Sequence, residues 1–263
     1  MFLCFGIIKL QKSTHRNIVV VLQKRLKMKK IFAKIICCFV PFRGLRRLIR
    51  LKADVPVRKY VKYAKSFSSS KHPRIEVSCG YRGANLVVNV DDKYIFKFPR
   101  YGDARAISLR EKQITDALRP ISPIKIPEMQ ILHFNGVYVR KYEYVKGIGF
   151  HFLDKKTQIK HAKKIGQQLA EFLYVVGMSD PVAIRDLKPK KSEKPSMMYG
   201  WSQNDLWDNF LMDNETYDII AAIDWEDARF GDFCAAFTRE KNNTRVQEAL
   251  LRAYIQKVKS AQK

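Results

Sequence analysis

The 263-residue sequence has no uninterrupted apolar run long enough to cross a bilayer. Its longest apolar stretch, residues 31–42, is broken by Lys34, whereas a spanning helix needs roughly twenty apolar residues. Cysteine is scarce as well, with five residues and no CxxC pair, which argues against a zinc site and a disulfide framework. The five histidines are equally scattered, so no His/Cys metal centre is expected. Scattered cysteines in an odd number favour reduced thiols in a cytosolic compartment.

Acidic residues are almost missing from the first 74 positions, which hold twenty Lys/Arg and one acid, Asp54. The remaining residues hold thirty bases and twenty-four acids, so most of the net charge of +25 belongs to a basic arm. Its bases alternate with aliphatic and aromatic patches, a pattern typical of a segment lying in a membrane interface. We therefore expect residues 1–65 to contact an anionic membrane, holding a cytoplasmic protein peripherally on the inner membrane.

Two other interpretations of the arm stay open. Nucleic acid would also attract many bases, but here the bases interleave with Ile, Phe and Cys rather than with polar residues and stacking aromatics, so no nucleic-acid partner is expected. A solvated tail is the third interpretation.

The arm and the following domain are separated by composition. Residues 28–50 loosely resemble leaders of bacterial surface-polysaccharide enzymes, which suggests Met28 as the biological start. The serine-rich stretch 66–70 has the composition of a linker. We therefore predict an extension over residues 1–73 and a domain that begins near Arg74.

Short strand patterns separated by turn residues open the domain. Residues 75–78, 86–90 and 94–98 have the apolar content or alternation of strands, and a turn with Gly80 and Gly83 joins the first two. Glycine is needed where backbone amides must approach phosphate oxygens, because a side chain would keep them apart. We therefore predict that Gly80 and Gly83 bind nucleotide phosphates; a simple hairpin turn is the alternative.

A strand lysine and a helical glutamate follow. Lys97 lies between two phenylalanines, where it either snorkels from a sheet edge or meets phosphates. A helix is predicted from Asp103 to about Leu118, with Glu111 beside its apolar stripe. Because a strand lysine paired with a helical glutamate holds the phosphates in kinases, we predict a Lys97–Glu111 pair, with a solvated Glu111 as the alternative.

Two more strands are expected at 129–134 and 137–144, joined by an Asn-Gly turn. The next segment, "YEYVKGIGF", has two glycines that let the chain change direction. If this segment is a hinge, backbone groups of Tyr144 and Val145 would meet the adenine edge of a nucleotide.

The second half of the chain is predicted to be mainly helical, with amphipathic helices at 156–176 and 244–259. Between them lie "SQNDLWDNFLMD" (202–213) and "YDIIAAIDWEDARFGDF" (217–233). Both place acidic residues beside short apolar runs, as at strand ends packed against a core. Phosphoryl transfer asks the protein for alignment and positive charge more than for covalent chemistry, and carboxylates in one cleft can hold Mg²⁺.

The first of these segments resembles the catalytic loop H-G-D-L-x-x-x-N-x-L of aminoglycoside-phosphotransferase and choline-kinase-like enzymes. The second resembles their metal-binding segment, and the motifs stand in family order over more than half of the chain. The resemblance implies that Asp205 is the catalytic aspartate, which orients and deprotonates the acceptor hydroxyl. It implies that Asn209 and Asp224 hold Mg²⁺ on the nucleotide phosphates. It also implies that Lys97 and Glu111 anchor those phosphates.

Two positions depart from the family pattern. Gln203 stands in place of the usual histidine, and Asp205 and Asn209 are four residues apart rather than five. Either the loop is tightened or Asp208 shares the metal role. A catalytically degenerate, nucleotide-binding pseudokinase is therefore an alternative to an active enzyme.

The resemblance implies an α+β, two-lobed protein-kinase-like fold, with an antiparallel sheet and helix at 74–145 and a mainly helical catalytic lobe at 146–263. It implies ATP- and Mg²⁺-dependent phosphorylation of a hydroxyl on a small molecule or saccharide. The basic arm repels a polycationic aminoglycoside and fits an anionic surface-polysaccharide precursor at the cytoplasmic membrane face. A choline or ethanolamine kinase is the alternative, because Trp201, Trp207 and Trp225 could form an aromatic cage, although core packing is expected of each taken singly.

Overall fold

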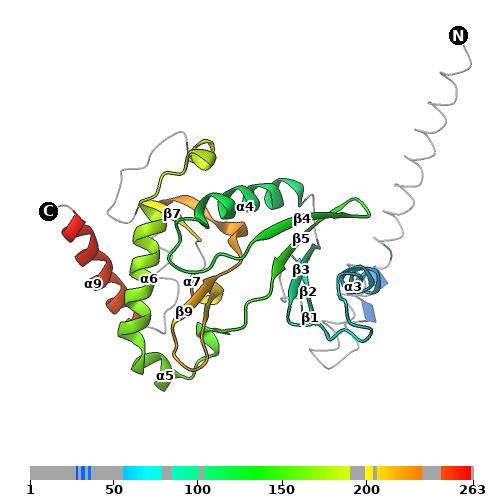
Figure 1. Cartoon of the computed structure of the whole chain (residues 1–263), viewed down its shortest axis with the longest axis horizontal. Helices are drawn as coiled ribbons and strands as arrows, with labels where there is room; N and C mark the ends of the chain where they lie inside the picture. The colour runs from blue at the N-terminus through cyan, green and yellow to red at the C-terminus, as the bar shows by residue number, and fades with distance from the viewer. Residues whose placement is uncertain are drawn as a thin grey trace, which may run out of the picture.

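The computed structural model in Figure 1 describes residues 56–78, 85–100, 104–189, 199–203, 206–232 and 244–261, together with residues 28, 31, 32, 35 and 36. An antiparallel sheet with helices on its two faces forms the first half, and helices with short strands form the second (Figure 1). This arrangement confirms the predicted α+β, two-lobed fold class. None of the helices in the described ranges combines the length and hydropathy that crossing a membrane requires.

The N-terminal lobe contains a five-stranded sheet with strand order β1-β2-β3-β5-β4. Its strands are β1 (Ile75–Ser78), β2 (Asn85–Val90), β3 (Tyr94–Pro99), β4 (Met129–Phe134) and β5 (Val137–Glu143). The turns that join them have the backbone that tight hairpins need. Asp91, Asp92, Asn135 and Gly136 all have positive φ, and Asx and Gly residues tolerate this left-handed conformation best. The Asn135-Gly136 turn confirms the hairpin predicted between β4 and β5.

The two faces of the sheet differ in character. Because side chains alternate along a strand, Phe96 and Phe98 on β3 lie on one face with Val139 of β5, within one buried apolar cluster. Lys97 points to the opposite face together with its cross-strand partner Arg140. The polar face is the one that contributes to the candidate site.

A helix ahead of the sheet, α3 (Val57–Lys65), covers the apolar face. Tyr60 and Ala64 are buried in the same cluster, and the Tyr60 ring stacks on Phe98 with a centroid distance of 4.3 Å. The N-terminal lobe therefore starts before the predicted boundary near Arg74. Composition assigned α3 to the basic arm, but its apolar residues recur at helical spacing and fill the surface of the sheet.

The predicted linker is also tied to the lobe. The Ser68 hydroxyl donates to the Asp91 carboxylate in the β2–β3 turn, and the backbone N–H of Arg74 donates to the same carboxylate at 2.7 Å. These bonds hold the connection between α3 and β1 against the hairpin.

One long helix packs against the polar face of the sheet. This helix, α4 (Arg105–Leu118), confirms the predicted helix, although Asp103, where the prediction begins, lies outside the described residues. Its buried residues include Glu111, Ile114 and Leu118. The glutamate is therefore carried inward on the same stripe as the apolar side chains.

The C-terminal lobe is built on helices α5 (Lys155–Lys160), α6 (Ala162–Gly177), α7 (Leu206–Asn209) and α9 (Thr244–Ala261). Its strands are β6 (Ile148–Gly149), β7 (Tyr199–Ser202), β8 (Phe210–Met212), β9 (Ile219–Ala222) and β10 (Arg229–Asp232). Short 3₁₀ turns occur at η1 (Phe150–Phe152), η2 (Val182–Leu187) and η3 (Trp225–Asp227). The single helix predicted over 156–176 is two helices, because His161 leaves the helical conformation with φ −99° and ψ 6°.

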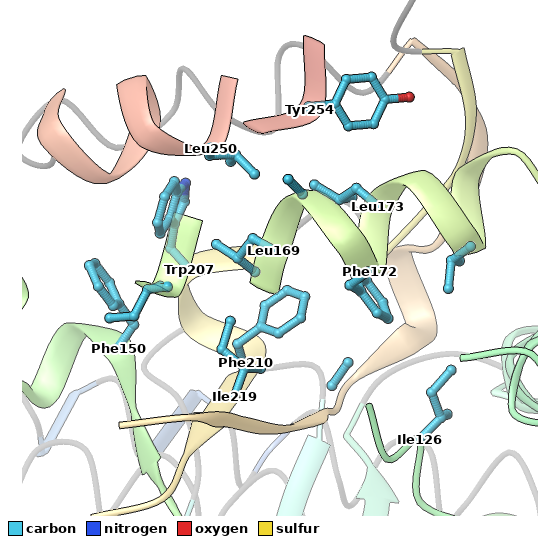
Figure 2. Packing of buried hydrophobic residues seen from close by; sticks show 14 of the residues in the cluster. Ile126, Phe150, Leu169, Phe172, Leu173, Trp207, Phe210, Ile219, Leu250 and Tyr254 are labelled. Carbon is cyan, nitrogen blue, oxygen red and sulfur yellow. The ribbon is translucent and has the colours of Figure 1, made fainter. Parts of the chain in front are cut away.

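The core of this lobe lies between α6, α9 and the strands β8 and β9 (Figure 2). Leu169 and Phe172 of α6 contribute to it together with Phe210 of β8 and Leu250 of α9. Helices α6 and α9 approach closely at Gly166, where an added Cβ would lie 2.6 Å from the backbone nitrogen of Leu250. This core supports the β8–β9 hairpin. Two predicted site residues flank the hairpin: Asn209 directly precedes β8, and Asp224 follows β9.

Candidate active site

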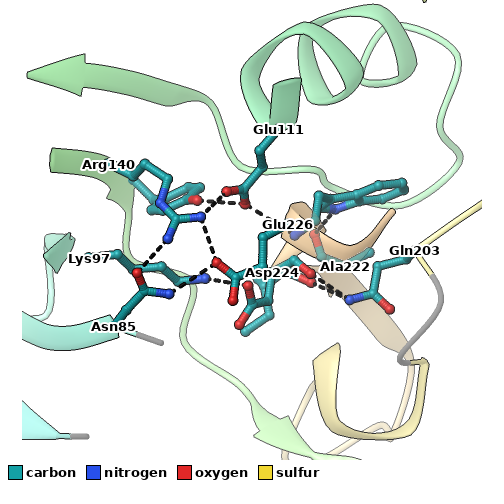
Figure 3. Close-up of polar contacts among 11 residues, drawn as sticks. Asn85, Lys97, Glu111, Arg140, Gln203, Ala222, Asp224 and Glu226 are labelled. Carbon is teal, nitrogen blue, oxygen red and sulfur yellow. Dashed lines mark hydrogen bonds and ion pairs between the residues drawn. The ribbon is translucent and has the colours of Figure 1, made fainter. Parts of the chain in front are cut away.

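A lysine from the N-terminal lobe and an aspartate from the C-terminal lobe meet between the lobes (Figure 3). The Lys97 ammonium lies 2.7 Å from a carboxylate oxygen of Asp224. Lys97 is buried and Asp224 is about one-third exposed at its side chain. The structure thus brings together two residues that are remote in sequence and that were both predicted to act on nucleotide phosphates or their metal.

Asp224 has an unusual backbone conformation that is fixed from the neighbouring loop. Its φ of 59° and ψ of 67° are left-handed, a conformation that costs a non-glycine residue energy. The buried Gln203 side chain donates to the carbonyl of Ile223 at 3.1 Å and to that of Asp224 at 2.7 Å. A side-chain amide carries two N–H donors, so glutamine suits this position, where the resembling family has histidine.

Asn209 is held beside the same loop. It ends α7 immediately before β8, and its carbonyl accepts a 2.9 Å hydrogen bond from the backbone N–H of Ile223. Because Phe210 of β8 pairs with Ala222 of β9, the hairpin brings Asn209 close to Asp224. Carboxylate and amide oxygens are the ligand types that Mg²⁺ takes, so these two residues fit the ion predicted for them.

Other predicted residues cannot be placed. Asp205, Gly80 and Gly83 lie outside the described residues, as does the side chain of Asp208. Within the described ranges, no group of three or more His, Cys, Asp or Glu side chains is arranged to hold a metal. The roles of these residues therefore stay predictions.

Glu111 does not pair with Lys97 as predicted. Its carboxylate binds the Arg140 guanidinium in a fully buried ion pair, and it accepts from the Tyr142 hydroxyl at 2.7 Å and from the Trp225 backbone N–H at 3.1 Å. Arg140 lies next to Lys97 across β3 and β5, and its forked guanidinium offers more donors than an ammonium. Arg140 therefore binds Glu111 in place of Lys97.

Arg140 connects both lobes (Figure 3). Besides Glu111 it donates to Glu226 at 2.8 Å and to the side-chain oxygen of Asn85 at 2.6 Å, and Asn85 in turn donates to Glu226 at 3.0 Å. Burial lowers the pKa of the Arg140 guanidinium, but the charges of Glu111 and the other partners raise it further, so its net pKa lies above the ordinary value. Burial and then Glu111 raise the pKa of Tyr142 well above its usual range.

Sequence reasoning missed Arg140, Asn85 and Glu226. One signal was present: Arg140 is two residues from Tyr142 on a predicted strand, so both were bound to share a face. The face on which Arg140 lies, and the carboxylates that it binds, depend on the register of β5 with β3.

The predicted hinge contains one backbone donor that is already in use. The Tyr144 N–H donates to the carbonyl of Lys93 at 2.8 Å, within the N-terminal lobe. That N–H is therefore already paired, and the contact of Tyr144 and Val145 with adenine stays a prediction.

The tryptophans near the motifs are core residues. Trp201, Trp207 and Trp225 are all buried, and each packs on a phenylalanine: Phe230, Phe150 and Phe172 respectively. A quaternary ammonium cannot reach rings buried in this way. The aromatic cage considered for choline is therefore wrong.

Known structures resemble this arrangement of lobes over most of the chain. A GDP complex of aminoglycoside 2'-phosphotransferase-IIIa matches with a TM-score of 0.60, covering 75% of this chain and 82% of that one at 16% identity. The ADP-bound aminoglycoside phosphotransferase APH(2'')-Ib matches with a TM-score of 0.56, covering 79% and 84% at 15% identity. This chain has the aminoglycoside phosphotransferase fold.

The same fold is found in enzymes named for another antibiotic class. Macrolide 2'-phosphotransferase MphH from Brachybacterium faecium matches with a TM-score of 0.54, covering 75% of this chain and 82% of that one at 14% identity. No family model matches the sequence, and no curated protein is similar to it. The aminoglycoside phosphotransferase fold is thus recognised here through structure.

Proposed function

We propose that this protein is an ATP-dependent phosphotransferase that phosphorylates a hydroxyl group of a small molecule. The observation that supports this most is the 2.7 Å pair between Lys97 and Asp224, one from each lobe. Phosphoryl transfer needs a cation at the phosphates and a carboxylate for the metal ion within one small volume. The pair supplies both groups, in a fold shared with small-molecule phosphotransferases.

The roles of the chain's own residues follow from their chemistry. Bound Mg²⁺ would neutralise charge that develops on the transferred phosphoryl group. Asp224 and Asn209 would hold that ion through oxygen atoms, and Lys97 would leave Asp224 to meet a phosphate. Asp205 would orient the acceptor hydroxyl and take its proton.

We propose an anionic or lipid-linked saccharide as acceptor, such as a surface-polysaccharide precursor. The neighbours named above are aminoglycoside and macrolide enzymes, and an aminoglycoside carries several positive charges. The basic arm of this chain would repel such a ligand and attract an anionic one.

A role at the membrane face is supported by five residues of the arm. Met28, Ile31, Phe32, Ile35 and Ile36 are helical, and their side chains are exposed. Their spacing places them on one side of a helix, within a segment rich in bases. An exposed apolar face beside bases is what an anionic membrane interface binds.

Vesicle flotation tests the membrane proposal. The full chain should float with phosphatidylglycerol vesicles and not with phosphatidylcholine vesicles. A Phe32→Asp/Ile35→Asp variant should lose flotation, whereas Ile107→Asp, which alters an exposed isoleucine on α4, should keep it. Equal flotation of both variants, or a shift of DNA at the same protein concentration, would count against the membrane.

Labelled ATP tests the enzymatic proposal. Purified protein with Mg²⁺ and a bacterial metabolite extract should transfer label to a small molecule, and Asp205→Ala and Asp224→Asn should each abolish transfer. Asp227→Asn is the matched control, because Asp227 is exposed three residues beyond Asp224. Nucleotide binding without any transfer would instead identify a pseudokinase, and label on choline would identify a choline kinase.

A further inference from the structure

Lys97 and Arg140 are direct neighbours across two strands, yet they bind different carboxylates. Cross-strand partners point to the same face, and like charges placed opposite each other destabilise a sheet. Here Lys97 binds Asp224, whereas Arg140 binds Glu111 and Glu226. Each of the two neighbouring cations is therefore paired with its own carboxylates.

The carboxylate of Glu111 is fully committed to partners other than Lys97. One oxygen binds the Arg140 guanidinium, and the other accepts from the Tyr142 hydroxyl and the Trp225 backbone N–H. Both Arg140 and Glu111 are almost completely buried. A buried charge stays in place only when it is paired, so α4 is anchored to β5 through this contact.

The same contacts reach the loop that carries Asp224. Trp225 is bound through its backbone to Glu111, and Glu226 is bound through its side chain to Arg140 and Asn85. Asp224 is therefore held on one side by Gln203 and followed on the other by two residues tied to the N-terminal lobe. These bonds hold the backbone on both sides of Asp224.

We propose that Arg140 is a positioning residue that anchors α4 and fixes the Asp224 loop to the N-terminal lobe, which leaves Lys97 available for phosphates. Its role for Mg²⁺ and nucleotide rests on the proposed function. The anchoring itself does not, because it is a property of the chain without ligands.

Arg140→Lys tests the proposal, because lysine keeps the charge but lacks the guanidinium fork. Arg185→Lys is the matched control, since Arg185 is exposed and its ion pair with Asp180 lies at the surface. Glu226→Gln is a second variant at a partly exposed position, in case Arg140→Lys does not fold. All are compared as full-length protein.

The first measurement is hydrogen exchange of the Trp225 amide, whose N–H is bound to Glu111. Losing a hydrogen bond to a charged group should speed this exchange by about tenfold or more in Arg140→Lys and Glu226→Gln. Exchange should stay unchanged in Arg185→Lys. Unchanged exchange in both test variants would overturn the proposal.

The second measurement is calorimetric binding of ADP with and without Mg²⁺. The gain in affinity on adding Mg²⁺ should shrink in Arg140→Lys, while binding without Mg²⁺, which depends on Lys97, should be kept. A full Mg²⁺ gain together with fast Trp225 exchange would overturn the positioning role and leave a merely structural one. Wild-type protein that binds no nucleotide would overturn the proposed function, and the exchange result alone would then decide whether Arg140 anchors the loop.

Discussion

The side-chain amide of Gln203 is bound to the carbonyl of Asp224 at 2.7 Å, and its second hydrogen bond goes to the preceding carbonyl. This glutamine is fully buried, so its amide makes these two hydrogen bonds away from water. The left-handed turn at Asp224 therefore depends on donors from a residue twenty-one positions earlier in the chain.

Replacing Gln203 should affect both stability and activity. Gln203→Leu would leave carbonyls without their side-chain donors, at a cost of about 1–3 kcal/mol in the free energy of unfolding, and it should slow phosphate transfer because Asp224 loses its support. Gln203→His should keep more of both, since an imidazole retains an N–H donor. Urea unfolding and the labelled-ATP assay measure the two effects, and a leucine variant as stable and active as wild type would contradict this role.

The contact of α3 with the sheet predicts that this helix stabilises the N-terminal lobe. Tyr60→Ala removes a buried ring that stacks on Phe98, and such a truncation costs about 3 kcal/mol. Lys59→Ala, at an exposed neighbouring position, should change the free energy of unfolding by less than about 0.5 kcal/mol. Chemical denaturation of both variants compares them directly. Similar midpoints would mean that α3 does not contribute to the fold.

Local patterns were sufficient to predict much of the N-terminal lobe. The Asn135-Gly136 and Asp91-Asp92 turns are specified by residues that tolerate positive φ, and the flanking strands by alternation. Helix α3 was not assigned to the lobe because its abundant lysines made it look like the rest of the arm. An amphipathic helix shows its apolar stripe in the sequence, but not the surface that this stripe covers.

The sequence predicted which residue types form the candidate site, but it predicted less well which side chains pair with one another. Lys97 and Asp224 were found from motifs and lie together, whereas Glu111 binds Arg140. The choice between two neighbouring cations depends on side-chain geometry and on the register of β3 with β5, and neither is visible in a local pattern. Likewise, His161 ends α5 although the apolar periodicity of the sequence continues through it.

Asp154 should make the stability of helix α5 depend on pH in acid. Its carboxylate accepts from the Thr157 hydroxyl and, at 3.0 Å, from the Thr157 backbone N–H, and these bonds lower its pKa from 3.8. A carboxyl whose pKa falls on folding contributes stability above its unfolded value, and this contribution is lost as the pH falls through the folded pKa. The difference in unfolding free energy between wild type and Asp154→Ala should therefore be constant above about pH 5 and shrink below pH 3.8. A difference that grows on acidification would contradict the cap.

The close approach of α6 and α9 gives the sharpest packing test. A Cβ at Gly166 would lie 2.6 Å from the backbone nitrogen of Leu250 and 2.8 Å from the Ala249 side chain, so the helices must move apart to admit it. Gly166→Ala should destabilise the protein by about 1–3 kcal/mol, although alanine favours a helix by up to about 1 kcal/mol over glycine. Gly231→Ala is the control, because nothing lies within 4 Å of a Cβ added there. Thermal unfolding should show a lower midpoint for Gly166→Ala alone; a higher midpoint would mean that helix propensity outweighs the contact and that α9 packs less closely than the structure indicates.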